Sequence, residues 1–317
     1  MYESQLFVMI YYSIIIPHKN IPDLLQYCLD SIPVRDDVQV IVVDDNSDAD
    51  KVDFEHFPQW KGDNYELYLT KKSGGTGYAE NVGIGYAKGK WILFSGADDY
   101  MLSSINEVFD EEKETDADMV YFRPTAVMLD DRVSFSKRGD WYNSIIDRYF
   151  ATGDETELRC SYFSICGRLI SREMIMGKDI RFDEIQYSND NLFAVKVGVN
   201  ARKIEIRDKS IYCITESNHT LTSNFMKKPG ELQIRSDAFF RAQKVVHEHG
   251  YPVDEELSLK YLRKLFSEDG KAFLLNFGRM RKMGYKKSWL IHELFKGNSR
   301  KARIKRSVYT FLATGIR

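Results

Sequence analysis

The chain has 317 residues, 43% of them hydrophobic and 13% aromatic, which is enough for a sizeable core and excludes an intrinsically disordered protein. Its 45 basic and 47 acidic side chains nearly cancel, so overall charge does not favour nucleic acid as a partner. The four cysteines lie far apart without a CxxC pair, and we expect reduced thiols in a cytoplasmic protein rather than a zinc site. The apolar run 6–16 is shorter than the roughly 20 residues that span a bilayer, and we expect a strand there rather than a membrane anchor or a signal peptide.

The first 130 residues alternate between short apolar runs and amphipathic segments, which predict strands and helices in turn. We expect strands at 11–16, 38–43, 65–70, 91–94 and 119–128, and helices at 22–32, 78–87 and 103–112. Asn20 is expected to cap the first helix, with Pro22 in its first turn. This alternation is typical of an α/β fold with a mostly parallel, doubly wound sheet and helices on both faces.

From residue 130 to about 225 the pattern is less regular. We expect helices at 141–150 and from Asn189 onward, a compact segment at 162–174, and short strands at 203–206 and 210–214. After Pro229 the chain is expected to be helical to its end. These patterns predict an α/β domain over 1–228, with halves at about 11–130 and 131–228, and a helical extension over 229–317.

The end of the chain is strongly basic. From Arg279 onward it holds twelve lysines and arginines against one acid, Glu293. Apolar residues recur there at helical spacing, at Trp289, Leu290, Leu294 and Phe295 and again at Ile304, Val308, Phe311 and Leu312. Residues 279–317 could thus bind an anionic membrane surface as a cationic amphipathic helix. The alternative is an apolar face that packs on the rest of the protein while the charges stay solvated.

Two of the apolar runs end in adjacent aspartates, Asp44-Asp45 and Asp98-Asp99. Because ligands of open α/β sheets bind at the carboxyl ends of the strands, we expect both pairs to face one cleft. Like charges placed together repel, and a divalent cation bound with a polyphosphate would offset that repulsion. The two pairs therefore indicate a site for a nucleotide and a metal ion.

Four blocks of sequence carry a resemblance to a known family. They are SIIIPHKN at 13–20, VVDDNS at 42–47, AENVG at 79–83 followed by AKG at 87–89, and the aspartates at 98 and 99. In order and spacing they resemble the nucleotide-binding half of the family 2 inverting glycosyltransferases of the GT-A fold. The resemblance covers about residues 11–130, extends more weakly over 160–225, and is absent from the helical extension.

The resemblance implies transfer of a sugar from a nucleotide-diphosphate sugar, with UDP as the expected nucleotide, to a hydroxyl of a glycan or lipid-linked acceptor, with inversion. It also implies a role in the assembly of bacterial capsule, exopolysaccharide or lipopolysaccharide. Such an enzyme is expected at the cytoplasmic face of the membrane, as a cytoplasmic or peripheral protein, with no nucleic-acid partner.

The resemblance places donor-nucleotide contacts at five positions, Pro17, Asp44, Asp45, Asn81 and Asp98. Asp45 would accept a hydrogen bond from the base, which discriminates well because a wrong base leaves a buried group unpaired. The alternative for Asp44 and Asp45 is a structural role in capping the following turn. The resemblance also assigns Mn²⁺ or Mg²⁺ to Asp98 and Asp99, with Gly96 in the place of the usual first acid.

The resemblance implies that Asp190 is the catalytic base. The family has a Glu-Asp pair opening a helix, and here the block at 188–193 has Asn189 in the glutamate's place. A base of this kind deprotonates the acceptor hydroxyl. The alternative is an acid stabilised by the helix dipole. His219, in the segment 216–222, resembles a loop residue that closes over the donor, and its alternative is an ordinary surface histidine.

Two further departures from the family pattern are Glu80, which replaces an arginine, and Lys19, which replaces a tyrosine beside the base. Together with Gly96 they keep a second hypothesis open, that of a catalytically silent partner subunit for another transferase. A sugar-phosphate nucleotidyltransferase is a third hypothesis. It would need a Gly-rich basic loop after the first strand, where this chain has Pro17 and His18.

Overall fold

The computed structural model describes residues 9–217 and 230–296. The chain divides into two compact units, Met1–Lys227 and Lys228–Arg317. The first unit contains all the described strands, and the described part of the second is entirely helical.

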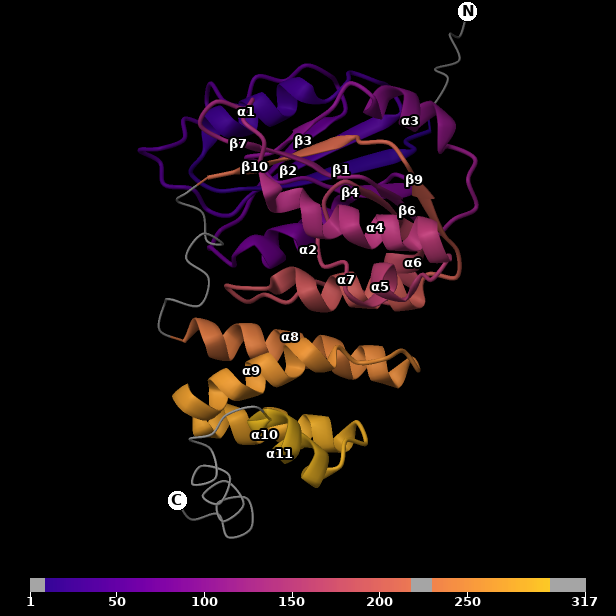
Figure 1. Cartoon of the computed structure of the whole chain (residues 1–317). Helices are drawn as coiled ribbons and strands as arrows, with labels where there is room; N and C mark the ends of the chain where they lie inside the picture. The colour runs from indigo at the N-terminus through magenta and orange to yellow at the C-terminus, as the bar shows by residue number, and fades with distance from the viewer. Residues whose placement is uncertain (1–8, 218–229, 297–317) are drawn as a thin grey trace, which may run out of the picture. The chain divides into compact units, whose positions relative to one another are not determined.

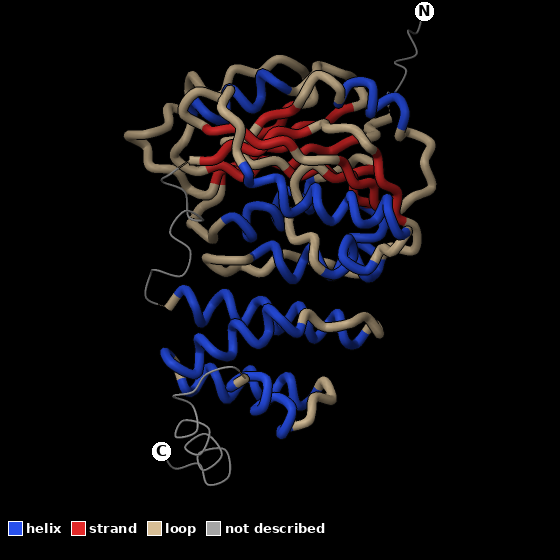
Figure 2. The backbone as a smooth tube through the Cα atoms, in the orientation of Figure 1, coloured by secondary structure: helices blue, strands red, loops and turns tan. Residues whose placement is uncertain are grey.

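A seven-stranded sheet forms the centre of the first unit, in the order β3-β2-β1-β4-β8-β6-β9 (Figure 2). Its strands are β1 (Tyr12–His18), β2 (Val38–Asp44), β3 (Tyr65–Leu69), β4 (Trp91–Phe94), β6 (Met119–Phe122), β8 (Arg168–Ser171) and β9 (Ile204–Arg207). The first four in this order run parallel, and β9 is parallel to β6. Only β8 is antiparallel to its neighbours β4 and β6. The mostly parallel α/β sheet predicted from the sequence is confirmed.

Helices cover both faces of this sheet (Figure 1). One face carries α1 (Pro22–Ser31) and α3 (Ile105–Glu111), and the other carries α2 (Thr76–Tyr86), α4 (Asp140–Thr152), α5 (Thr156–Cys160), α6 (Arg172–Gly177) and α7 (Asn189–Asn200). Ile14 and Ile16 belong to the core under α1, whereas Ile15 between them belongs to the core under α2. Successive strand residues point to opposite faces, so a strand covered on both sides must be apolar throughout.

The segment 119–128 differs from the sequence-based expectation of one strand. It forms β6 and a separate strand β7 (Thr125–Met128), which joins a small sheet with β5 (Tyr100–Met101) and β10 (Tyr212–Glu216) in the order β5-β10-β7. Pro124 lies between the two strands. Proline lacks the N–H that a central strand needs, so the ladder is interrupted and the chain changes sheet.

The predicted cap of the first helix is also wrong. The N-cap position is Ile21, and Asn20 adopts a left-handed backbone conformation with φ 59°. The Asn20 side chain instead pairs with Asp48, donating from Nδ2 to Oδ2 at 3.0 Å and accepting from the Asp48 N–H at 2.8 Å. The side chain therefore joins the loops after β1 and β2, and Pro22 begins the helix without it.

The described part of the second unit consists of α8 (Glu231–Glu248), α9 (Glu255–Glu268), α10 (Gly270–Lys282) and α11 (Lys287–Phe295). Asp254 and Asp269 cap α9 and α10 through bonds to backbone N–H groups. Leu290 and Leu294 of α11 are buried, so the first half of the basic segment's apolar pattern packs inside this unit. The second half, at 304–312, lies outside the described residues. Among the described helices, none combines the length and apolarity of a membrane span.

Candidate functional site

Asp44 ends β2 and is buried, at 1% exposure. Its Oδ2 pairs with Nδ1 of His18 at 2.7 Å and accepts from Ser47 Oγ at 2.5 Å, while Oδ1 accepts from the Ser47 N–H at 2.8 Å. His18 ends the neighbouring strand β1, opposite Asp44 in register. Asp44 therefore holds together the ends of two strands and the turn that follows, which is the capping role that the sequence left open.

Asp45 is also buried, and it binds the glycine-rich loop before α2. It accepts from Ser73 Oγ at 2.7 Å, from the Gly74 N–H at 2.7 Å and from the Gly75 N–H at 3.0 Å. Lys19 Nζ lies 3.8 Å from its Oδ2. A carboxylate offers about four acceptor positions, so three are taken by this loop and a further donor would meet the fourth. The carboxylate therefore positions the loop, and its expected contact with a base stays a prediction.

The Asp98-Asp99 pair follows β4 and is anchored from β10. The Tyr212 hydroxyl donates to Asp99 Oδ2 at 2.5 Å, and the Thr215 N–H donates to Asp99 Oδ1 at 2.6 Å. The same Tyr212 oxygen accepts from the Gly96 N–H at 2.9 Å, and Thr215 Oγ1 donates to the Asp98 carbonyl at 2.8 Å. The sequence indicated the acidic pair but carried no signal for Tyr212 or Thr215, which hold it in place.

The electrostatics of this pair suit a cation. Burial and, next in size, the neighbouring charge of Asp98 raise the pKa of Asp99 to about 7. A Cβ added at Gly96 would lie 2.8 Å from Asp98 Oδ1 and 2.9 Å from Asp99 Oδ2. One oxygen of each carboxylate therefore converges on the space beside Gly96, where a side chain would collide with both. Oxygen ligands in such an arrangement fit Mg²⁺ or Mn²⁺ with phosphate oxygens and water in the remaining positions.

Asn81 on α2 forms hydrogen bonds with the segment that precedes α7. Its Oδ1 accepts from the Phe182 N–H at 2.9 Å, and its Nδ2 donates to the Phe182 carbonyl at 3.1 Å and to Glu184 Oε1 at 3.3 Å. Gly77, one turn earlier, lies against the same segment, because a Cβ there would come 2.2 Å from the Asp183 carbonyl oxygen. The structure thus gives Asn81 a structural partner, and its expected contact with the donor stays a prediction.

Asp190 lies in the first turn of α7 and is half-buried. The neighbouring Asn189 donates from Nδ2 to Oε2 of Glu80 on α2 at 3.0 Å. Burial raises the pKa of Glu80 well above its usual range, and the charge of Asp190 contributes to that shift. Glu80 is buried, with only 4% of its surface exposed to solvent.

The pKa values of Cys166 and Tyr142 are both affected by charges of the predicted site residues. Burial raises the pKa of the Cys166 thiol, and the charges of Asp99, Glu80 and Asp190 all contribute. Burial likewise raises the pKa of Tyr142 to about 12, with Asp190 as the next contributor. The charges of the predicted metal-binding acid and the predicted base therefore both act on this thiol, which lies beside Phe94 at the end of β4.

Arg168 is a buried cation inside the central sheet. It is fully buried on β8, and its guanidinium lies 5.2 Å from the ring centres of both Tyr121 and Tyr162. Its three side-chain nitrogens have no hydrogen-bond partner within the described residues. Cation–π contact with the two rings partly replaces the lost hydration. Arg138, half-buried, bonds the Thr215 carbonyl at 3.3 Å and lowers the raised pKa of Asp99.

Two further predicted residues and one acidic cluster complete the description of the site. Pro17 is half-buried in β1 opposite Val43, and its expected contact with the nucleotide stays a prediction. His219 lies outside the described residues. Among the described acids and histidines, the cluster of three that could hold a cation is Asp53, Glu55 and His56, all exposed on the loop after β2.

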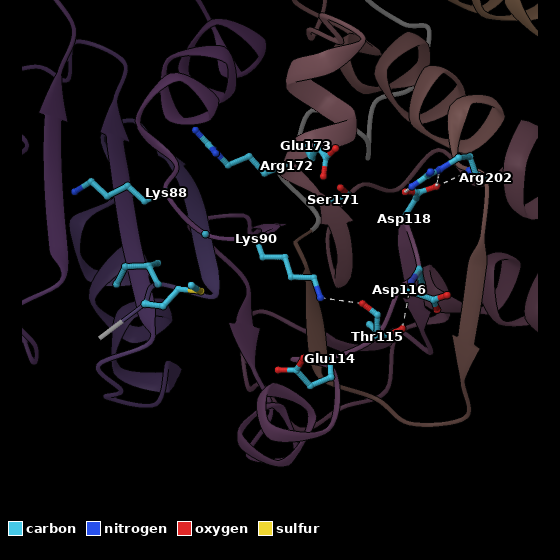
Figure 3. A pocket seen from close by; sticks show the side chains of 14 residues that line it. Lys88, Lys90, Glu114, Thr115, Asp116, Asp118, Ser171, Arg172, Glu173 and Arg202 are labelled. Atoms are coloured by element: carbon cyan, nitrogen blue, oxygen red, sulfur yellow. Dashed lines mark hydrogen bonds and ion pairs between the residues drawn. The ribbon is translucent and has the colours of Figure 1, made fainter. Parts of the chain in front are cut away.

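A separate cleft of 680 Å³ lies at the opposite edge of the sheet, where β1, β4 and β6 begin (Figure 3). Its lining includes Lys90, Asp118, Arg172 and Arg202. Arg202 pairs with Asp118, and Lys90 donates to the carbonyls of Lys113 and Thr115. Arg202 and Asp118 thus neutralise each other, and the cleft lies away from the carboxyl ends of the strands.

Comparison with known proteins gives a family match over residues 13–176, just over half of the chain, to the family described as "Glycosyl transferase family 2". The chain is 25% identical over 229 residues to the uncharacterized glycosyltransferase EpsJ of Bacillus subtilis, covering 66% of this chain and 62% of that protein. It is 35% identical over 113 residues to a poly(ribitol-phosphate) beta-glucosyltransferase of Bacillus spizizenii, covering 34% of this chain and 18% of that protein. The chain therefore spans less than two thirds of each of these relatives.

Solved structures share the fold. The structure of residues 1–349 of Staphylococcus aureus TarS in complex with UDP-GlcNAc aligns with a TM-score of 0.63 at 18% identity, over 96% of this chain and 92% of that chain. A mannosyltransferase of Pyrobaculum calidifontis, PcManGT, in complex with GDP-Man and Mn²⁺, aligns with a TM-score of 0.52 at 15% identity, over 95% of this chain and 80% of that chain. At these identities the likeness concerns the fold, which is the GT-A fold.

Proposed function

Because the chain belongs to glycosyl transferase family 2, we propose that it transfers a sugar from a nucleotide-diphosphate sugar to an acceptor hydroxyl. The observation that carries this proposal is the acidic pair after β4, in which one oxygen of Asp98 and one of Asp99 lie beside Gly96 while Tyr212 and Thr215 hold Asp99 in place. An acidic pair held in this way suits a metal ion that binds the diphosphate of a sugar donor.

The proposed donor is a UDP-sugar. Asp45, buried beside the loop at 73–75, has an acceptor position to offer an N–H of uracil. UDP-GlcNAc is the compound bound in the TarS structure. Pro17 and Asn81 are proposed to line the same nucleotide, with Asp98 toward the diphosphate.

The proposed cofactor is Mn²⁺ or Mg²⁺. Asp98 and Asp99 would hold it beside Gly96, with Tyr212 and Thr215 fixing the orientation of Asp99. When bound, such an ion neutralises the charge of the diphosphate leaving group. Its presence in the PcManGT complex supports a metal in this fold.

The proposed reaction inverts the anomeric carbon. Asp190 accepts the proton of the acceptor hydroxyl while that oxygen forms a bond to the anomeric carbon. The bond from this carbon to the diphosphate oxygen breaks at the same time, and its electron pair leaves with the nucleoside diphosphate. Because attack and departure occur on opposite faces of the sugar, the configuration inverts. Alignment of the three reacting groups supplies a large part of the rate.

The proposed acceptor is a glycan or lipid-linked glycan of the bacterial cell surface. The curated relatives include poly(ribitol-phosphate) transferases, which supports an envelope polymer. A location on the inner face of the membrane, through the basic segment 279–317, belongs to the same proposal.

Release of UDP or another nucleoside diphosphate tests the function. The full chain is incubated with a panel of nucleotide sugars, with and without Mn²⁺, and the products are separated. Metal-dependent release from one UDP-sugar is the expected result. Binding of UDP without release from any donor would favour a catalytically silent partner subunit. Release of pyrophosphate from a nucleoside triphosphate and a sugar phosphate would identify a nucleotidyltransferase instead.

A further inference from the structure

The side chain of Glu80 lies in the contact between α2 and α7. Three α2 residues at positions i, i+3 and i+4, namely Gly77, Glu80 and Asn81, face the segment that leads to Asp190. Gly77 packs on the Asp183 carbonyl, Asn81 binds both backbone groups of Phe182, and Glu80 accepts the amide of Asn189. This face of α2 is therefore the support on which the start of α7 rests.

The start of α7 needs such support. Its N-cap residue Ser188 has a left-handed backbone conformation, with φ 57°. Non-glycine residues in this conformation cost free energy and persist where surrounding contacts hold them. The Glu80–Asn189 hydrogen bond of 3.0 Å connects the side chain of the first residue of α7 to α2. Asp190 is the next residue along the chain.

We propose that Glu80 is a positioning residue that acts through Asn189 to set the orientation of Asp190 toward the acceptor hydroxyl. This inference rests on the proposed role of Asp190 as the base. The Glu80 carboxyl group is buried, and burial and the charge of Asp190 raise its pKa. The raised pKa favours the neutral form, in which Glu80 would hold Asn189 without a second negative charge beside the base.

Four variants of the full chain test this inference, together with Asn200→Ala as a matched control. Asn200 is at the far end of the same helix and donates to the Lys196 carbonyl. Glu80→Ala and Asn189→Ala should each lower kcat for nucleotide release by roughly 10- to 100-fold, because misplacement of a reacting group is costly. The KM for the donor and the Kd of UDP should not change. Glu80→Gln, which can still accept from Asn189, should keep kcat close to that of the wild type.

The double variant Glu80→Ala/Asn189→Ala distinguishes positioning from two separate effects. If both residues act through one contact, the kcat of the double variant should equal that of the less active single variant. Multiplied losses, or an unchanged kcat in Glu80→Ala while Asp190→Asn is inactive, would overturn the inference and leave the proposed function standing. A wild type that binds UDP but releases no nucleoside diphosphate from any donor would overturn the proposed function itself, and the inference with it.

Discussion

The Tyr212 hydroxyl donates a 2.5 Å hydrogen bond to Asp99, 113 residues earlier in the chain, and accepts one from the Gly96 N–H. The oxygen of one tyrosine thus connects both ends of the turn that carries the acidic pair. Tyr212 lies in β10, which pairs with β5 in the small sheet, and β5 begins directly after the acidic pair. The small sheet therefore determines where Asp99 points.

Tyr212→Phe should destabilise the fold and weaken metal binding. It leaves the buried Asp99 oxygen and the Gly96 N–H without this partner, at a cost of about 1–3 kcal/mol in the free energy of unfolding. Loss of an orienting partner should weaken Mn²⁺ binding roughly 10-fold or more. Urea unfolding and calorimetric titration of Mn²⁺ in the presence of UDP measure the two effects. Tyr65→Phe is the control, because the buried Tyr65 hydroxyl has no partner within the described structure and its removal should not destabilise. Equal behaviour of the two variants would contradict the assigned role of Tyr212.

Asp190→Asn should abolish most turnover and leave the donor site intact. Removal of a general base costs about 10²–10⁴-fold in rate. UDP binding, measured by calorimetry, should match the wild type. Asp179→Asn is the control, because Asp179 is exposed and has a left-handed backbone conformation that asparagine tolerates. Near-normal kcat in Asp190→Asn would rule out its role as the base.

Asn81→Ala separates a structural role from a nucleotide contact. It removes the partners of the Phe182 N–H and carbonyl, so the free energy of unfolding should fall by about 1–3 kcal/mol. If Asn81 also contacts the donor, the Kd of UDP should rise in the folded variant. Asn64→Ala, which removes a single bond to the Asp36 carbonyl, serves as the control. A destabilised variant with an unchanged UDP Kd would show that Asn81 stabilises the fold and does not contact the donor.

Glu80→Gln should stabilise the protein increasingly as pH rises. The folded-state pKa of Glu80 is raised by burial, so between its unfolded and folded pKa values the native state keeps a proton that the unfolded state releases. Wild-type stability contributed by this group is therefore present below the unfolded pKa and is lost as pH rises toward the folded pKa. The advantage of the glutamine variant should grow by about 1.4 kcal/mol per pH unit over that window. Urea unfolding at pH 4 to 8 measures it, with Glu173→Gln as an exposed control. A pH-independent difference would show that Glu80 is ionised in the native state.

Truncation after residue 296 tests membrane contact. A cut at about 278 would remove α11, whose Leu290 and Leu294 are buried in the helical unit. Reduced membrane binding of such a truncation could then result from unfolding of that unit. Residues 297–317 contribute six of the twelve basic residues counted from Arg279. Their removal should reduce co-sedimentation with anionic vesicles and leave that with neutral vesicles unchanged. Equal pelleting of both proteins on anionic vesicles would eliminate the membrane proposal for this segment.

The sequence by itself determined the α/β class, the positions of the central strands and the two acidic pairs at their ends. These features are local, because a strand buried on both faces must be continuously apolar and its end is marked where polar residues begin. The break at Pro124 was equally local and could have been read from the missing N–H.

Only the tertiary structure decided what each acid does. Asp44 ends β2 and Asp45 follows it, yet Asp44 binds the end of β1 and Asp45 binds the loop before α2. Glu80 and Asn189, noted separately as departures from the family pattern, meet across 109 residues. Asp99 owes its orientation to Tyr212 and Thr215. Such contacts depend on how distant elements pack, and side-chain direction and burial follow from that packing rather than from the order of residues along the chain.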